Sequence, residues 1–153
     1  MSQAILVVGG AGYIGSTVSA ELRRVGHPVV VLDDFSKGHR QAVPQGCLVV
    51  EGSVHDGALL DRILQEHRPK AVMHFAAFIE AGESMREPGR FFRNNTFGTL
   101  SLLESMVRNQ VQRLVFSSTA AVYGTPERVP ITEEVPLAPT NAYGESKLMV
   151  ERM

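Results

Sequence analysis

Short runs of apolar residues alternate along the chain with longer segments whose apolar positions recur at helical spacing. The runs are mostly β-branched or large residues, which is typical of strands buried on both faces. They are Ala4–Val8, Val29–Leu32, Cys47–Val50, Ala71–Phe75 and Arg113–Ser117. The segments between and after them predict helices over Tyr13–Val25, Gly57–His67, Pro88–Asn109 and Asn141–Met153.

This alternation predicts the fold class. Strand–helix–strand units build right-handed crossovers and therefore a parallel sheet. We expect an α/β fold over residues 1–153, a Rossmann-type doubly wound sheet with the strand order 3-2-1-4-5. Its ligand should bind at the carboxyl ends of the strands, near the point where the strand order reverses. The proline-rich stretch 119–140 predicts a long, irregular loop.

The composition does not identify a function, but it excludes several classes of partner and site. With 20% charged residues and a formal net charge of −1, the chain offers no electrostatic reason to bind nucleic acid or a membrane surface. Cys47 is the single cysteine, so no intrachain disulfide is possible. No apolar run approaches the roughly 18 residues of a membrane span, and we expect a cytoplasmic protein. The histidines show no metal-ligand spacing, so no metal site is expected.

A glycine-rich turn follows the first predicted strand directly. Gly9, Gly12 and Gly15 have the spacing GxxGxxG, which lets the backbone approach a pyrophosphate at the start of a helix. Asp33 ends the second predicted strand, where a carboxylate accepts hydrogen bonds from ribose hydroxyls and repels a 2′-phosphate. The pattern predicts a dinucleotide site, and Asp33 favours NAD over NADP. The alternative is that the glycines only form a tight turn. Ser16 stands where a P-loop requires lysine, which argues against an NTPase.

Three further residues indicate proton-transfer chemistry. Tyr143 and Lys147 are four residues apart, on one face of a predicted helix. An ammonium beside a phenol favours the phenolate, which makes Tyr143 a possible base. Thr119 follows the fifth predicted strand and brings a hydroxyl to the carboxyl edge of the sheet. Taken singly, these are ordinary surface or capping residues, but together, after a dinucleotide turn, they favour catalysis.

With these residues in view, the sequence resembles the extended short-chain dehydrogenase/reductase family, and within it the UDP-glucose 4-epimerases. The resemblance covers essentially the whole chain. It rests on the segments GGAGYIGS, VVLDDFSKGH, HFAAFIEAGES, NNTFGTL, LVFSSTAAVYG and PTNAYGESKLMVE.

The resemblance implies an isomerase that acts on a UDP-sugar. Tyr143 would remove the proton of the sugar 4-hydroxyl while a hydride passes from C4 to NAD, and the keto sugar would turn and take the hydride back. Thr119 would supply the catalytic hydroxyl, and Lys147 would bind the nicotinamide ribose. The residues implied to line NAD are Gly9, Gly12, Tyr13, Ile14, Gly15, Asp33, Asp34, Phe35, Ser36, Ser53, Val54, Phe75, Ala76, Ala77, Asn94, Tyr143 and Lys147.

The sequence departs from the family pattern in three ways. Many relatives carry an acidic residue where Ser53 stands, which leaves weaker or backbone recognition of the adenine. Some carry a lysine where Ile79 stands. Relatives are also much longer, so we expect a truncated NAD-binding domain with its sheet incomplete at the C-terminal end. We expect the substrate domain to be absent, the chain to be inactive alone and the full-length protein to be a homodimer. Leu148, Val150 and Met153 should then lack apolar partners.

Two kinds of alternative stay open. A nucleotide-sugar 4,6-dehydratase would need an acid/base pair directly after Thr119, where this chain has Ala120 and Ala121. Another NAD-dependent nucleotide-sugar epimerase or reductase fits the same residues, because nothing that reads the sugar has been identified. A non-catalytic NAD-binding module is the alternative from another class.

Overall fold

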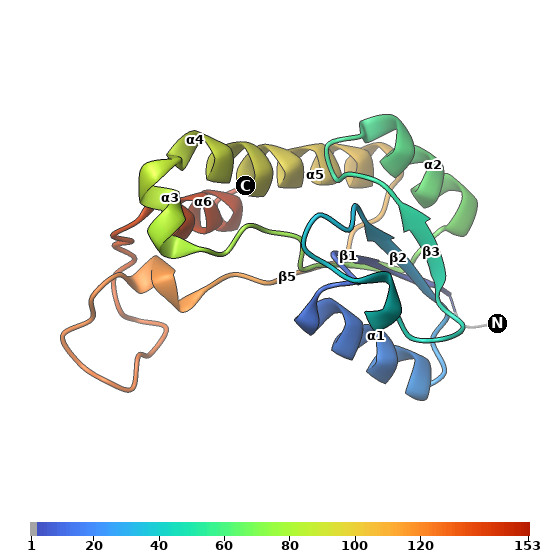
Figure 1. Ribbon diagram of the computed structural model, residues 1–153, viewed down its shortest axis with the longest axis horizontal. Helices are drawn as coiled ribbons and strands as arrows, with labels where there is room; N and C mark the ends of the chain where they lie inside the picture. Colours follow the sequence, from blue (N-terminus) through green and yellow to red (C-terminus); the bar gives the residue numbers. More distant parts are fainter. Residues whose placement is uncertain (1–2) are drawn as a thin grey trace. The chain divides into compact units, whose positions relative to one another are not determined.

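The computed structural model describes residues 3–153, which fold as two compact units (Figure 1). Unit 1 holds the described chain up to Ala76 and the segment Ser101–Ser117, and unit 2 holds Ala77–Leu100 and Ser118–Met153. Among these residues, no helix has the length and apolar character needed to cross a membrane.

Unit 1 is built on a five-stranded parallel sheet with the order β3-β2-β1-β4-β5. In register, Val8 at the end of the central strand lies opposite Leu32 on one side and His74 on the other. The predicted Rossmann-type fold and its strand order are therefore confirmed. The strands are β1 (Ile5–Val8), β2 (Val29–Asp33), β3 (Leu48–Glu51), β4 (Ala71–His74) and β5 (Leu114–Phe116).

The sheet separates two apolar layers, because successive side chains of a strand point to opposite faces. Leu6 and Val8 of β1 pack with helices α2 (Gly57–His67) and α5 (Gly98–Arg108). Ile5 and Val7 pack on the other face, with Leu22 of α1 (Tyr13–Arg24). Figure 1 shows α1 on the opposite side of the sheet from α2. Full burial of an apolar side chain of this size contributes about 1.5–3 kcal/mol, which explains the all-apolar central strand.

The outer strands carry the mixed pattern of sheet edges. Leu48 in β3 is 47% exposed and Val115 in β5 is 51% exposed, whereas every residue of β1 and β2 is buried. Both outer strands of the described sheet thus expose part of their apolar surface.

Unit 2 is helical. It contains α3 (Ala81–Arg86), α4 (Pro88–Phe91), a π-helical segment Phe92–Phe97, a 3-10 turn Ala120–Tyr123 and α6 (Ala142–Glu151). The helix predicted over Pro88–Asn109 is confirmed, although its middle widens into the π-helical segment. Such widened turns concentrate at functional sites. The short helix α3 has too few turns to show a period and was not predicted.

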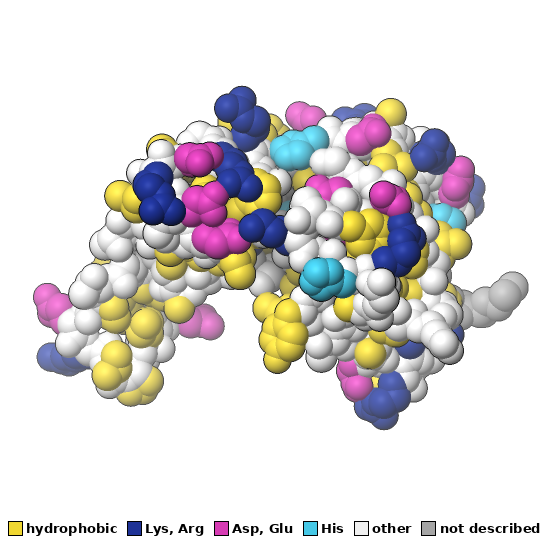
Figure 2. All heavy atoms as spheres, in the orientation of Figure 1, with side chains coloured by type: hydrophobic (Ala, Val, Ile, Leu, Met, Phe, Trp, Pro, Cys, Tyr) yellow, Lys and Arg dark blue, Asp and Glu magenta, His cyan; other side chains and the backbone are white. Residues whose placement is uncertain are grey.

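The prediction that three apolar side chains at the end of the chain lack partners is wrong for Leu148 and Val150, whereas Met153 is 51% exposed. Leu148 and Val150 are buried, because α6 packs against α3, α4, the π-helical segment and the 3-10 turn. The stretch 119–140 is irregular beyond its 3-10 turn, as predicted. Its apolar side chains Val129 and Leu137 are exposed, and apolar side chains are visible on that loop at the lower left of Figure 2.

Candidate functional site

Two glycines of the turn after β1 are required by the fold itself. Gly9 has a φ of +80°, and a Cβ there would lie 2.4 Å from the backbone nitrogen of Ala76. A Cβ on Gly15 would lie 2.1 Å from the carbonyl oxygen of Gly9, because the first turn of α1 packs directly on the loop. Both positions therefore admit only glycine, with or without a ligand.

Gly12 is different. Its φ is −80°, and a Cβ there would meet only the Gly9 carbonyl oxygen, at an ordinary 3.5 Å. The chain itself has room for a side chain, so the room above Gly12 is available to a ligand. The protein's own packing therefore does not require glycine at this position, and the backbone stays open to the close approach of a ligand at the start of α1.

The same turn leaves the start of α1 open. Gly12 is the N-cap of α1 and offers no side-chain acceptor, and the first turn of the helix carries no acidic residue. By contrast, Asp56 caps α2 and Asn141 caps α6 with their side chains. Tyr13 is 91% exposed and Ile14 52% exposed at this helix start. Uncapped N–H groups at the positive end of a helix form an anion site.

Asp33 lies at the carboxyl end of β2 and joins it to the glycine turn. Its two carboxylate oxygens accept the backbone N–H groups of Ala11 and Phe35, each at 2.9 Å. Each oxygen keeps a further lone pair, so the carboxylate can still accept from a ribose hydroxyl. The bonds with Ala11 and Phe35 also give Asp33 a structural role, which is compatible with ribose binding.

The loop after β2 packs against the glycine turn. Asp34 accepts hydrogen bonds from the backbone and hydroxyl of Ser36, and Phe35 adopts a left-handed φ of 56° beneath the Arg40 guanidinium. A Cβ on Gly38 would lie 2.8 Å from Ala11, so this glycine allows the loop to approach. Sequence reasoning missed Gly38, although it lies in the quoted segment VVLDDFSKGH.

The remaining predicted residues of unit 1 follow β3 and β4. Ser53 accepts the N–H of His55 at 3.2 Å. Val54 is only 8% exposed and its side chain belongs to the apolar core, so only its backbone can face a ligand. Phe75 and Ala76 donate their N–H groups to the carbonyl of Val8, which brings the end of β4 beside the glycine turn.

In unit 2, the predicted Tyr143 and Lys147 lie one turn apart on α6. Tyr143 is half-buried, whereas Lys147 is 3% exposed. Burial lowers the pKa of Lys147 from 10.5 to about 8, because an ammonium is costly to remove from water. The side chain still carries a positive charge at neutral pH.

Thr119 lies in the same unit, at the start of the 3-10 turn. Its Oγ1 accepts the N–H of Ala121 at 3.1 Å, which holds the side chain and leaves the hydroxyl hydrogen for another acceptor. This turn packs against α6 beside Tyr143, since a Cβ on Gly144 would lie 2.7 Å from the Ala121 carbonyl oxygen. The requirement for Gly144 was not recognised from the sequence.

Asn94 is half-buried and donates to the side-chain oxygen of Asn95 at 3.0 Å. Asn95 in turn exchanges two hydrogen bonds with the backbone of Phe78, at 2.8 and 3.0 Å. Asn95 thus ties the π-helical segment to the chain just after Ala77. The sequence pattern offered no means of choosing Asn95, because its neighbour Asn94 is the same residue type.

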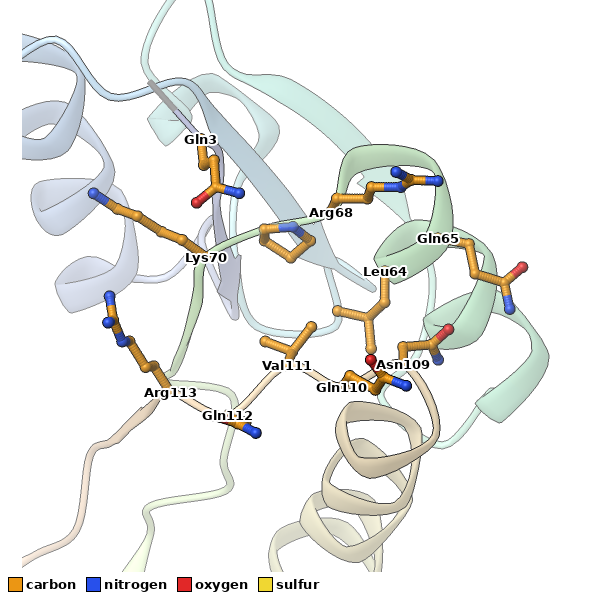
Figure 3. Close-up of a pocket in the computed structure, with 11 residues that line it drawn as sticks. Gln3, Leu64, Gln65, Arg68, Lys70, Asn109, Gln110, Val111, Gln112 and Arg113 are labelled. Atoms are coloured by element: carbon orange, nitrogen blue, oxygen red, sulfur yellow. The ribbon is translucent and has the colours of Figure 1, made fainter. Parts of the chain in front are cut away.

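A separate hollow in unit 1 lies at the amino ends of the strands, where Lys70 and Arg113 precede β4 and β5 (Figure 3). It measures about 520 Å³ and is lined largely by amide and basic side chains. None of the predicted site residues lines it. The glycine turn lies at the other ends of the strands, where doubly wound sheets bind their ligands.

Comparison with known proteins relates the chain to one family. The model of the NAD dependent epimerase/dehydratase family matches residues 5–153. A UDP-glucose 4-epimerase of Azospirillum brasilense is 51% identical over 152 residues, which are 99% of this chain and 44% of that protein. One of Lactobacillus helveticus is 46% identical over 97% of this chain and 45% of that protein.

A solved UDP-glucose 4-epimerase from Brucella ovis, in complex with NAD, superposes with a TM-score of 0.97 at 43% identity, over 99% of this chain and 46% of that one. The Thermotoga maritima UDP-glucose 4-epimerase with UDP-glucose gives 0.93 at 38% identity, over 98% and 49%. The chain thus spans less than half the length of these relatives.

Proposed function

This chain belongs to the NAD dependent epimerase/dehydratase family, and on that premise we propose that it forms the NAD-binding part of a UDP-glucose 4-epimerase. The glycine turn and Asp33 would hold the cofactor, and Thr119, Tyr143 and Lys147 would supply the catalytic side chains. The relatives named above, one with NAD and one with UDP-glucose, support the choice of cofactor and substrate.

The observation that carries the proposal is the open space above Gly12 at the uncapped start of α1. A pyrophosphate is an anion that needs both close backbone approach and free N–H groups. Asp33, at the end of the adjacent strand, fits an adenosine ribose that has both hydroxyls free. Its carboxylate would repel a 2′-phosphate, so NAD is the expected nucleotide rather than NADP.

NAD, when bound, supplies a hydride acceptor for the sugar C4 and a donor that returns the hydride. The Tyr143 phenolate would take the proton of the 4-hydroxyl, and the Thr119 hydroxyl would donate a hydrogen bond to the same substrate oxygen. Lys147, charged and buried one helical turn away, would stabilise the phenolate and bind the nicotinamide ribose.

The second candidate within the family is a dehydratase, which must also protonate a leaving hydroxyl. The two residues after Thr119 are Ala120 and Ala121, in the 3-10 turn, and neither can transfer a proton. Epimerisation needs no such pair, so the chain favours it. An epimerase of another UDP-sugar would fit the same residues, and a comparison of UDP-sugars as substrates distinguishes it.

Glycine-to-alanine substitutions test the cofactor site. Gly12→Ala should keep the melting temperature within a few degrees but weaken NAD binding at least about tenfold, since the new methyl occupies the pyrophosphate approach. Gly89→Ala is the matched control, because a Cβ there meets nothing within 4 Å. Calorimetric titration with NAD measures the affinities. Unchanged affinity in Gly12→Ala would remove the main support for the proposal.

We further propose that the full-length protein is a cytoplasmic homodimer and that this chain alone does not turn over UDP-sugars. Relatives more than twice as long support the second statement. Sedimentation of the full-length protein gives its mass in solution, and cell fractionation gives its location. A monomeric, fully active full-length protein would contradict the dimer.

A further inference from the structure

The backbone of Tyr143 lies in the first turn of α6, where helix N–H groups have no partner within the helix. Asn141 satisfies one of these groups, because its side chain accepts from Gly144 at 2.8 Å. Its carbonyl accepts the first bond within the helix, from Glu145 at 3.0 Å. The N–H of Tyr143 instead donates to a residue far away in sequence, the hydroxyl of Ser84, at 3.0 Å.

Ser84 is well placed to hold that bond. It lies on α3, is completely buried, and donates its own hydrogen to the carbonyl of Ala81 at 2.6 Å. Because the hydroxyl hydrogen is used in that bond, the oxygen lone pairs remain to accept from Tyr143. The side chain therefore has a fixed orientation before the tyrosine is considered.

The carbonyl of Tyr143 is held in a similar way. It accepts the hydroxyl hydrogen of Ser146 at 2.7 Å, and that hydroxyl accepts the side-chain N–H of Asn95 at 3.0 Å. Both Ser146 and Asn95 are buried. Two buried serine hydroxyls thus fix the backbone of Tyr143 on both sides, one of them from another helix.

We propose that Ser84 is a positioning residue for catalysis, which acts by anchoring the backbone of Tyr143 and through it the phenol. The inference rests on the proposed function of Tyr143 as the proton acceptor. The Asn141 cap does not involve Ser84, so α6 can still begin at Ala142 without the serine hydroxyl. Loss of the hydroxyl should therefore shift the tyrosine rather than unfold its helix, and a displacement of about 1 Å can reduce a rate about a hundredfold.

The test compares Ser84→Ala with Ser19→Ala in the full-length protein. Ser19 is the matched control because it is also completely buried on a helix, and its hydroxyl has no hydrogen-bond partner among the described residues. We expect Ser84→Ala to lower kcat about 10- to 100-fold, with KM changed less than about threefold. Active enzyme is counted by bound NAD, so that a smaller folded fraction does not imitate the effect. Ser19→Ala should keep its kcat.

Hydrogen exchange at single amides gives a readout independent of activity. In Ser84→Ala, exchange at the Tyr143 amide should accelerate about tenfold, the usual effect of losing one hydrogen bond. The Gly144 amide, held by Asn141, should exchange as before. If Ser84→Ala does not fold, the same two measurements are made on Ser84→Cys, which replaces the hydroxyl with a slightly larger and weaker acceptor.

The possible outcomes distinguish failure of the proposed epimerase function from failure of the proposed role of Ser84. If the unmodified full-length protein shows no epimerase activity, the proposed function fails, and hydrogen exchange still decides whether Ser84 anchors Tyr143. If the protein is active but the Ser84 variants keep the kcat of Ser19→Ala, Ser84 is not a positioning residue. Unchanged exchange at Tyr143 would overturn the anchor itself.

Discussion

Replacing Lys147 by methionine should stabilise the ligand-free protein near neutral pH while damaging its activity. Lys147 is 3% exposed, and burial lowers its pKa from 10.5 to about 8. A difference of that size corresponds to roughly 3 kcal/mol of unfavourable free energy in the folded state, when the ammonium is charged. Methionine has similar length and no charge, so Lys147→Met should recover part of this penalty, about 1–3 kcal/mol after the loss of the interactions that the ammonium makes.

The pH dependence identifies the cause. Below about pH 8 the amine is protonated in both the folded and the unfolded chain, so the full penalty is present. Between about pH 8 and 10.5 the unfolded chain binds the proton and the folded chain does not, so the stability of the unmodified protein rises with pH relative to the variant. The advantage of Lys147→Met should therefore shrink across that window.

Urea unfolding at pH 7, 8, 9 and 10, after removal of bound nucleotide, measures the effect. Lys70→Met is the control for loss of one positive charge, because Lys70 is only partly buried. The reasoning is refuted if Lys147→Met is less stable than the unmodified protein at pH 7. It is also refuted if the difference is the same at pH 7 and pH 10. The variant should bind NAD more weakly and turn over more slowly, since the buried charge is kept for function.

Three further predictions concern the proposed chemistry. In the full-length protein, Tyr143→Phe should lower turnover about 10²- to 10⁴-fold and leave NAD bound, and near-normal turnover would show that another group is the base. Asp33→Ala should reduce the preference for NAD over NADP in calorimetric titrations. It should also cost about 1–3 kcal/mol of stability, because the buried N–H of Ala11 and the partly buried N–H of Phe35 lose their acceptor. A variant that keeps the full preference would contradict the assigned role. The 153-residue chain alone, supplied with UDP-galactose and NAD, should give no epimerisation, and robust turnover would show that the additional length of the relatives is dispensable.

Much of unit 1 followed from local pattern. The buried parallel strands read as short apolar runs because both faces of each are covered, and the α/β alternation then restricts the strand order to few choices. The glycine turn was recognisable because backbone geometry tolerates nothing else at Gly9 and Gly15. The pairing of Tyr143 with Lys147 was recognisable because four residues make about one helical turn.

Only the tertiary structure revealed the contacts that join distant segments. Ser84 and Tyr143 are 59 positions apart, and Asn95 and Ser146 are 51 apart. In the sequence, a serine that accepts a buried N–H cannot be distinguished from any other serine, so no local pattern identifies Ser84. Gly38 and Gly144 were likewise unremarkable until the backbones of Ala11 and Ala121 were seen against them.

The burial of α6 also depended on the tertiary structure rather than on the local sequence. Its apolar positions were plain in the sequence, but whether Leu148 and Val150 find partners depends on α3, α4, the π-helical segment and the 3-10 turn, which come from elsewhere in the chain. The low pKa of Lys147 has the same origin, because it results from burial rather than from any sequence neighbour. Residue types and their spacing thus determined which chemistry the chain carries, whereas desolvation and long-range hydrogen bonds, which exist only after folding, decided how its groups are held and tuned.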